Sequence, residues 1–193
     1  MGASARLHRG KPQVRVASGS EDGSVRIWDV QTGEVLHKLC GHSGAVHALT
    51  LRYQAGSGSG SPVSGLGQGA VEFVVSGSSD GSVRLWNVFT EKYEAELAGH
   101  GRPVLSLAVL ANGAIVSGAA DGSVRVWGPS QKHGPVDREK VVWSCEMEMV
   151  AHSQQVRSLS ALSLSSVSSA AFISGGADGQ IKLWELPIGA GRR

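Results

Sequence analysis

One twelve-residue pattern occurs four times in this 193-residue chain and restricts the folds open to it. The copies align without gaps: SGSEDGSVRIWD at 18–29, SGSSDGSVRLWN at 76–87, SGAADGSVRVWG at 117–128 and SGGADGQIKLWE at 174–185. Each has Ser-Gly, two further residues, Asp-Gly, a short apolar alternation, and a Trp six positions after the Asp. Such repetition indicates one supersecondary unit used several times, with a core formed where neighbouring units stack.

Between the loops, apolar residues alternate with period two, which is typical of β-strands. Asp-Gly pairs in all four copies predict tight hairpin turns. No segment has a helical period with caps, so we expect an all-β fold. The expected strands are 13–18, 24–30, 34–40, 45–52, 71–76, 82–88, 92–98, 103–110, 113–117, 123–127, 141–149, 155–162, 170–174 and 180–186.

The repeat spacing predicts two insertions. The number of residues between Trp86 and Trp127 falls within the ~40–45-residue period of one class of repeat. The separations between the repeat Trp residues of the other adjacent copies are longer. The extra length falls in the Gly/Ser-rich segment 53–70 and in the polar segment 128–140. The expected organisation is a flexible basic N-terminus at 1–12, a repeat unit at 13–186 with copies ending near 29, 87, 128 and 185, and a tail at 187–193.

Composition excludes several classes of protein. The formal net charge is +2, from 18 Lys and Arg against 16 Asp and Glu, which is too even for a nucleic-acid arm. The longest apolar stretch, 104–116, is shorter than the ~18 residues of a membrane span. Cys40 and Cys145 form no CxxC pair, which favours a reducing compartment. We therefore expect an intracellular protein of the cytoplasm, the nucleus or both.

The four copies resemble the WD-repeat β-propeller family over residues 13–186. The landmarks His, Ser, Asp and Trp occur in the family's order, and the terminal Trp-Asp is intact at Trp28-Asp29. In the other copies the Asp is replaced by Asn87, Gly128 and Glu185. The resemblance implies blades of four antiparallel strands, each covered on both faces by its neighbours.

The resemblance also implies a hydrogen-bonded set of four side chains within each blade. The matching sets are His42, Ser76, Asp80, Trp86; His100, Ser117, Asp121, Trp127; and His152, Ser174, Asp178, Trp184. The first copy keeps Ser18, Asp22 and Trp28, but no Gly-His or Ala-His pair precedes it. Because a polar network that lacks a member is weakened, we expect the first blade to be the least stable.

Two patterns resemble catalytic sites, and we interpret both as structural. Ser, His and Asp together could form a hydrolytic triad, but the set occurs three times, whereas a catalytic site normally occurs once. Ser79 lies at the centre of a GxSxG sequence, yet its counterparts are Glu21, Ala120 and Ala177, and a strand-to-helix context is missing. We expect no catalytic residue.

Metal, cofactor and nucleic-acid sites are also not expected. His37, His42 and His47 recur every five residues around Cys40, a spacing that aligns ligands on neither a strand nor a helix. No phosphate-binding loop motif occurs. One position is basic in every copy, which indicates a framework role rather than a nucleic-acid patch; its residues are Arg26, Arg84, Arg125 and Lys182.

The remaining class of function is the binding of other proteins. In the family, partners commonly bind the loops that precede the first strand of a blade and join its second and third strands. The matching positions are Glu21, Ala45, His47, Ser79, Pro103, Leu105, Ala120, Gln155, Arg157 and Ala177. Arg157 among small apolar neighbours fits a hot spot, and the alternative is a set of ordinary loop residues. We expect a non-catalytic scaffold or adaptor; the alternative is a nucleic-acid- or chromatin-associated reader subunit of a larger complex.

The strands suffice for about three and a half blades: three strands of a first, two full blades and three strands of a last. Propellers use about four to eight blades, so an arc of this size leaves sheet edges open to self-association. Two explanations remain: a fragment of a longer, seven-bladed propeller, or closure by association.

Overall fold

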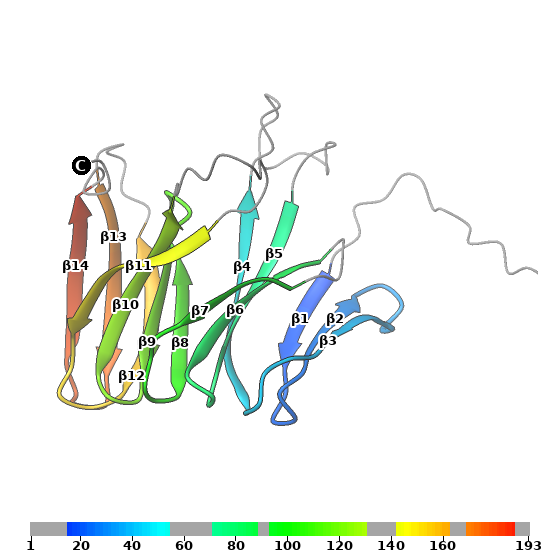
Figure 1. The fold of residues 1–193 in the computed structure, drawn as a ribbon, viewed down its shortest axis with the longest axis horizontal. Helices are drawn as coiled ribbons and strands as arrows, with labels where there is room; N and C mark the ends of the chain where they lie inside the picture. Colours follow the sequence, from blue (N-terminus) through cyan, green and yellow to red (C-terminus); the bar gives the residue numbers. More distant parts are fainter. Residues whose placement is uncertain (1–14, 55–70, 89–92, 131–141, 163–168, 188–193) are drawn as a thin grey trace, which may run out of the picture.

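The structure, a computed structural model, describes residues 15–54, 71–88, 93–130, 142–162 and 169–187 (Figure 1). Its strands are β1 (Arg15–Gly19), β2 (Val25–Asp29), β3 (Val35–Leu39), β4 (Val46–Gln54), β5 (Val71–Ser78), β6 (Ser82–Asn87), β7 (Tyr93–Ala98), β8 (Val104–Val109), β9 (Ile115–Ala119), β10 (Ser123–Ser130), β11 (Val142–Val150), β12 (Val156–Leu162), β13 (Ser169–Gly176) and β14 (Ile181–Pro187). Each of the fourteen overlaps an expected strand. These residues form no helix, and hence none that could cross a membrane.

Strands continue into both predicted insertions. β4 extends to Gln54, and β10 runs through Pro129 to Ser130, where it still pairs with β11. The remainder of both insertions lies outside the described residues, as do the predicted N-terminal segment and all but the first residue of the tail. The ladder between β10 and β11 is therefore longer than the alternation alone predicts.

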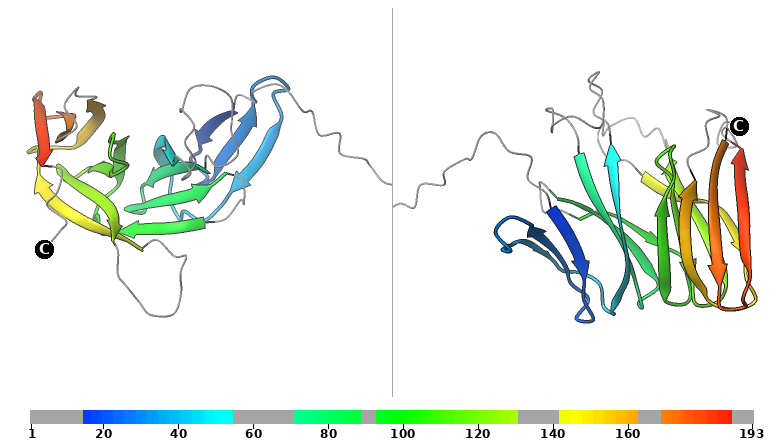
Figure 2. Two further views of the ribbon diagram at one scale, coloured as in Figure 1. Left: turned by 90° about the horizontal axis from the view of Figure 1, so that it is seen from above. Right: turned by 180° about the vertical axis from the view of Figure 1, so that it is seen from behind.

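The strands form four antiparallel sheets, which we call blades 1 to 4 in chain order. Blade 1 is β1-β2-β3, blade 2 is β4-β5-β6-β7, blade 3 is β8-β9-β10-β11 and blade 4 is β12-β13-β14. The two outer blades have three strands each, as the sequence predicts. Seen from above, the blades follow an open arc, with blades 1 and 4 at its two ends (Figure 2). The all-β fold and the incomplete propeller are both confirmed.

The core lies between the blades. Side chains alternate on the strand that follows each Asp-Gly turn, so one face of that strand presents two aliphatic residues and the other presents the Trp. Val25 and Ile27 of blade 1 share a buried cluster with Trp86 of blade 2. The next junction packs Val83 and Leu85 in the same way, against Trp127, and the third packs Val124 and Val126 against Phe172, with Trp184 at its edge. At each junction, the aliphatic face of one blade therefore packs against the Trp-bearing face of the next blade.

The Asp-Gly turns bring the hairpins against the connections between blades. Gly81 and Gly122 have φ of +80° and +84°, a backbone conformation that favours glycine. A Cβ on Gly81 would lie 2.6 Å from the carbonyl oxygen of His100, and one on Gly122 would collide with that of His152. These turns and the connections gather at one end of the sheets, the lower end in Figure 1.

Candidate binding face

Just inside this loop end, blade 2 contains a chain of four hydrogen-bonded side chains. Trp86 Nε1–H donates to Ser76 Oγ at 2.8 Å. Ser76 Oγ is 2.7 Å from His42 Nε2, and His42 Nδ1 is 3.0 Å from Asp80 Oδ2. Because an indole only donates and a carboxylate only accepts, a neutral His42 with its proton on Nδ1 satisfies every member. Burial lowers the pKa of His42, which favours this neutral form.

The carboxylate at the end of the chain is held in its ionised form. Burial raises the pKa of Asp80, but the hydrogen bonds from Ser82, Ser43 and His42 outweigh this effect and hold it well below its usual range. Ser43 N donates to the same Oδ2 at 3.0 Å. Asp80 thus joins the hairpin of blade 2 to the connection that enters the blade.

Blade 3 departs from the predicted set at its carboxylate. His100 Nε2 is 2.7 Å from Ser117 Oγ, which also accepts from Trp127 Nε1 at 2.8 Å. His100 Nδ1, however, is bonded to Ser123 Oγ at 3.1 Å and not to Asp121. Asp121 Oδ1 accepts from the backbone N of Ser123 at 2.9 Å, so this serine takes the predicted place of the carboxylate. With no carboxylate on the ring, burial lowers the pKa of His100 to about 4.

Blade 4 repeats the arrangement of blade 2. His152 Nε2 is 2.8 Å from Ser174 Oγ, and its Nδ1 is 3.0 Å and 3.1 Å from the two oxygens of Asp178. Trp184 Nε1 donates to Ser174 at 2.8 Å.

Blade 1 retains one bond of the set. Trp28 Nε1 donates to Ser18 Oγ at 2.7 Å. Asp22, the third predicted member, instead accepts from Ser24 N and Ser24 Oγ at 2.9 Å and 2.6 Å. Among the described residues, no histidine links the hairpin of blade 1 to its Trp–Ser pair, as one does in the other blades.

The serine that follows Asp-Gly is a further member of these sets that was not predicted from the sequence. Ser82 Oγ lies 3.2 Å from His42 Nδ1, and Ser123 makes the contact to His100 described above. The signal was present: Ser occupies this position in three copies, and Gln180 occupies it in the fourth.

The structure brings the predicted binding positions together in pairs. Within each of blades 2 to 4, the backbone N of the hairpin position donates to the carbonyl oxygen of the connection position. The bonds are Ser79 to Ala45 at 2.9 Å, Ala120 to Pro103 at 2.9 Å and Ala177 to Gln155 at 2.8 Å. In blade 2, His47 Nε2 and Ser79 Oγ add a contact of 2.7 Å. The hairpin and the connection are thus held together by a backbone hydrogen bond in each of blades 2 to 4.

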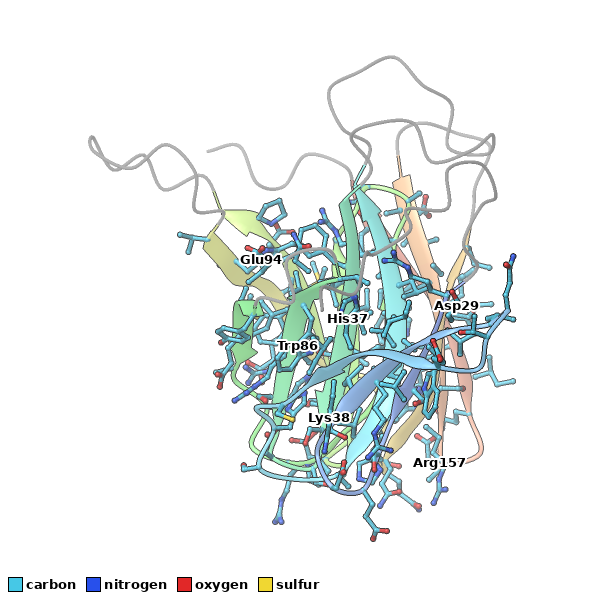
Figure 3. The ribbon with its side chains drawn as sticks, turned by 90° about the vertical axis from the view of Figure 1, so that its right-hand side faces the viewer. Asp29, His37, Lys38, Trp86, Glu94 and Arg157 are labelled. Atoms are coloured by element: carbon cyan, nitrogen blue, oxygen red, sulfur yellow. The ribbon has the colours of Figure 1, made fainter. Side chains whose placement is uncertain are left out.

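We call the ten predicted positions the loop face. Four of them are exposed, and all four are polar or charged: Glu21, His47, Gln155 and Arg157. The other six are half-buried and mostly small or apolar: Ala45, Ser79, Pro103, Leu105, Ala120 and Ala177. Arg157 lies at the lower end of the sheets in Figure 3. The loop face therefore combines partly covered apolar groups with exposed polar side chains.

The repeated basic position serves the framework. Arg84 is 3.3 Å from Glu96, and Arg125 is 2.7 Å from Glu148, both on outer strands. In the described part of the chain, no group of three or more His, Cys, Asp or Glu side chains is placed to hold a metal ion. Cys40 and Cys145 are free and exposed.

Comparison with known proteins agrees with this architecture. The family model "WD domain, G-beta repeat" matches residues 10–29, 33–87, 91–128 and 143–185. The chain belongs to the WD-repeat family.

Two relatives each match part of this chain. It is 37% identical over 82 residues to Periodic tryptophan protein 2 homolog of Neurospora crassa, covering 42% of this chain and 7% of that protein. It is 35% identical over 79 residues to WD repeat-containing protein 26 homolog of Arabidopsis thaliana, covering 41% of this chain and 11% of that protein. The chain therefore spans a small part of these relatives.

Two solved structures share the fold. Both are of computationally designed proteins, Ika8 and Ika4, with a TM-score of 0.63 and 27% identity. The match covers 92% of this chain and 44% of Ika8, and 95% of this chain and 98% of Ika4.

Proposed function

We propose that the chain is a non-catalytic protein-interaction scaffold that binds its partner through the loop face. The observation that carries this proposal is the backbone bond between hairpin and connection, repeated in blades 2, 3 and 4 above a buried hydrogen-bonded histidine. A surface braced in this way loses little conformational entropy when a partner binds, so more of the contact energy appears as affinity.

The chemistry of the loop face between blades 3 and 4 suggests the kind of partner. Ser106 Oγ donates to the carbonyl oxygen of Val156 at 3.1 Å, which places the start of β12 beside β8. Leu105 and Arg157 are the neighbours of these two residues in sequence, so the backbone brings an apolar and a cationic residue of the loop face near one junction. Arg is enriched at interface hot spots. We infer a protein segment that presents an apolar residue and a carboxylate.

Nucleic acid is a weaker alternative. Two of the arginines at the repeated basic position, Arg84 and Arg125, are paired with glutamates, and Arg26 is paired with Asp22, so less positive charge is available to phosphates. A protein partner needs no such stripe.

Charge reversal tests the proposal. Arg157→Glu reverses a charge on the loop face. The matched control Glu94→Arg reverses one exposed charge on β7, and Glu94 lies toward the opposite end of the sheets from Arg157 in Figure 3. Tagged chains are purified from lysate with and without nuclease treatment, and bound proteins are quantified by mass spectrometry. We expect Arg157→Glu to reduce the main partners by about tenfold or more, and the control to retain them. Equal retention by both variants contradicts the proposal, and loss of all partners on nuclease treatment favours nucleic acid.

A further inference from the structure

The last blade exposes an apolar face that every other blade buries. We call Ile173, Ile181 and Leu183 of blade 4 the trailing face. Ile181 is 80% exposed and Leu183 is 67% exposed. The equivalent residues of blade 2, Val83 and Leu85, are 0% and 1% exposed because blade 3 covers them.

The first blade exposes the opposite half of the same junction. We call Val16, Trp28 and Val30 of blade 1 the leading face. Val16 and Val30 are 50% and 52% exposed, and Trp28 is half-buried. Their equivalents in blade 2 are buried against blade 1: Val74 at 0%, Trp86 at 3% and Val88 at 2% exposed.

The two exposed faces are of the same two kinds that pack against each other at the junctions between blades. At the junction of blades 1 and 2, Val25 and Ile27 pack against the equivalents of the leading face. At the junction of blades 2 and 3, the equivalents of the trailing face pack against Trp127 and Ile115. Within the described residues, no blade covers the trailing face of blade 4 or the leading face of blade 1.

We propose that a second copy of this chain occupies these faces, with the leading face of each copy packed on the trailing face of the other. Such a head-to-tail contact forms a closed ring when its rotation closes, and a filament when it does not. Figure 2 shows both ends of the arc on the same side of the molecule, where one further arc can meet both. Two copies supply eight sheets, within the ~4–8 blades of propellers.

The structural comparison supports this geometry independently. The same arc corresponds to 98% of the Ika4 chain and to 44% of the longer Ika8 chain. A sheet arrangement of this size therefore occurs both as nearly a whole chain and as less than half of one. The proposed contact uses the faces of the end blades and leaves the loop face free. The contact and the proposed function are therefore tested by separate experiments.

The mass in solution tests the contact. Light scattering of the whole chain from micromolar to hundreds of micromolar should show a species of twice 20.0 kDa. Val30→Lys and Ile181→Glu each place a charge on one face and should weaken dimerisation by about tenfold or more. The matched control Val150→Lys changes an 82% exposed apolar residue on β11, outside both faces, and should leave the mass unchanged. Circular dichroism melting confirms that each variant is folded.

Mixing the two face variants distinguishes a head-to-tail contact from a symmetric one. Each variant keeps one intact face, so an equimolar mixture of Val30→Lys and Ile181→Glu should recover a dimer that neither forms alone. A monomeric wild-type chain overturns the proposal, as does a dimer that both variants preserve. Assemblies that grow steadily with concentration overturn the closed ring, and a heterodimer missing from the mixture overturns the head-to-tail contact.

Discussion

Ser117→Ala is the most informative perturbation of the buried hydrogen-bonded sets. The hydroxyl accepts from Trp127 Nε1 and is bonded to His100 Nε2, and these two side chains are 2% and 7% exposed. Removing it leaves two buried polar groups without a partner, at a cost of about 1–3 kcal/mol each. We expect the free energy of unfolding to fall by about 2–6 kcal/mol, a large part of the ~5–15 kcal/mol typical of a domain.

The chain provides a matched control for this substitution. Ser18→Ala in blade 1 removes only the bond from Trp28 Nε1, and Trp28 is half-buried, so water can replace the lost partner. The expected cost is about 0.5–1.5 kcal/mol. Both variants are measured by urea denaturation monitored by tryptophan fluorescence, with slopes compared so that midpoints report stability.

A difference of about 2 kcal/mol between Ser117→Ala and Ser18→Ala is the expected result. Equal losses, within about 0.5 kcal/mol, would refute the reasoning, because they would mean that the histidine link adds nothing to the Trp–Ser pair. The same experiment bears on the prediction that blade 1 is the least stable.

Three further outcomes are expected. The pKa of His100 is lowered to about 4 in the folded chain, whereas an unfolded histidine titrates near 6.5. The neutral ring therefore contributes about 3 kcal/mol of stability that is complete above pH 6.5 and is lost as the pH falls to about 4. A urea midpoint that stays constant between pH 7 and pH 4.5 would contradict this expectation. Gly81→Ala should cost about 2–4 kcal/mol, from its positive φ and its contact with the carbonyl of His100, whereas Gly33→Ala, with positive φ but open space, should cost about 1 kcal/mol; equal melting temperatures would contradict the contact. Arg52→Met removes a guanidinium 4.9 Å from the ring of Trp143 and should lower the free energy of unfolding by about 1–2 kcal/mol. An unchanged urea midpoint would show that this contact between blades 2 and 3 contributes no stability.

The order and number of strands follow from the sequence because local signals repeat in register. The Asp-Gly turns mark the hairpins, and the alternation that begins after each turn is long enough to identify a strand without knowledge of its neighbours. The division into three-, four-, four- and three-stranded sheets follows from the same count.

Contacts between blades could not be predicted in the same way. The bond from Arg52 Nε to the carbonyl oxygen of Gly113 joins residues far apart in sequence and carries no repeat signal. The contact of His100 with Ser123 in place of Asp121 could not be predicted either, because blades 2 and 3 have the same Asp-Gly-Ser sequence at this turn. Ile181 reads as its buried counterparts do, and only the structure shows that no blade covers it.

The proposed role of the loop face is tested most directly by photocrosslinking in cells. A photoreactive amino acid replaces His47, exposed on the loop face, or Glu94, exposed on β7. The expected result is a discrete protein adduct from position 47 that is absent, or several-fold weaker, from position 94. Adducts from position 94 with none from position 47 would contradict the assignment of the loop face as the binding surface.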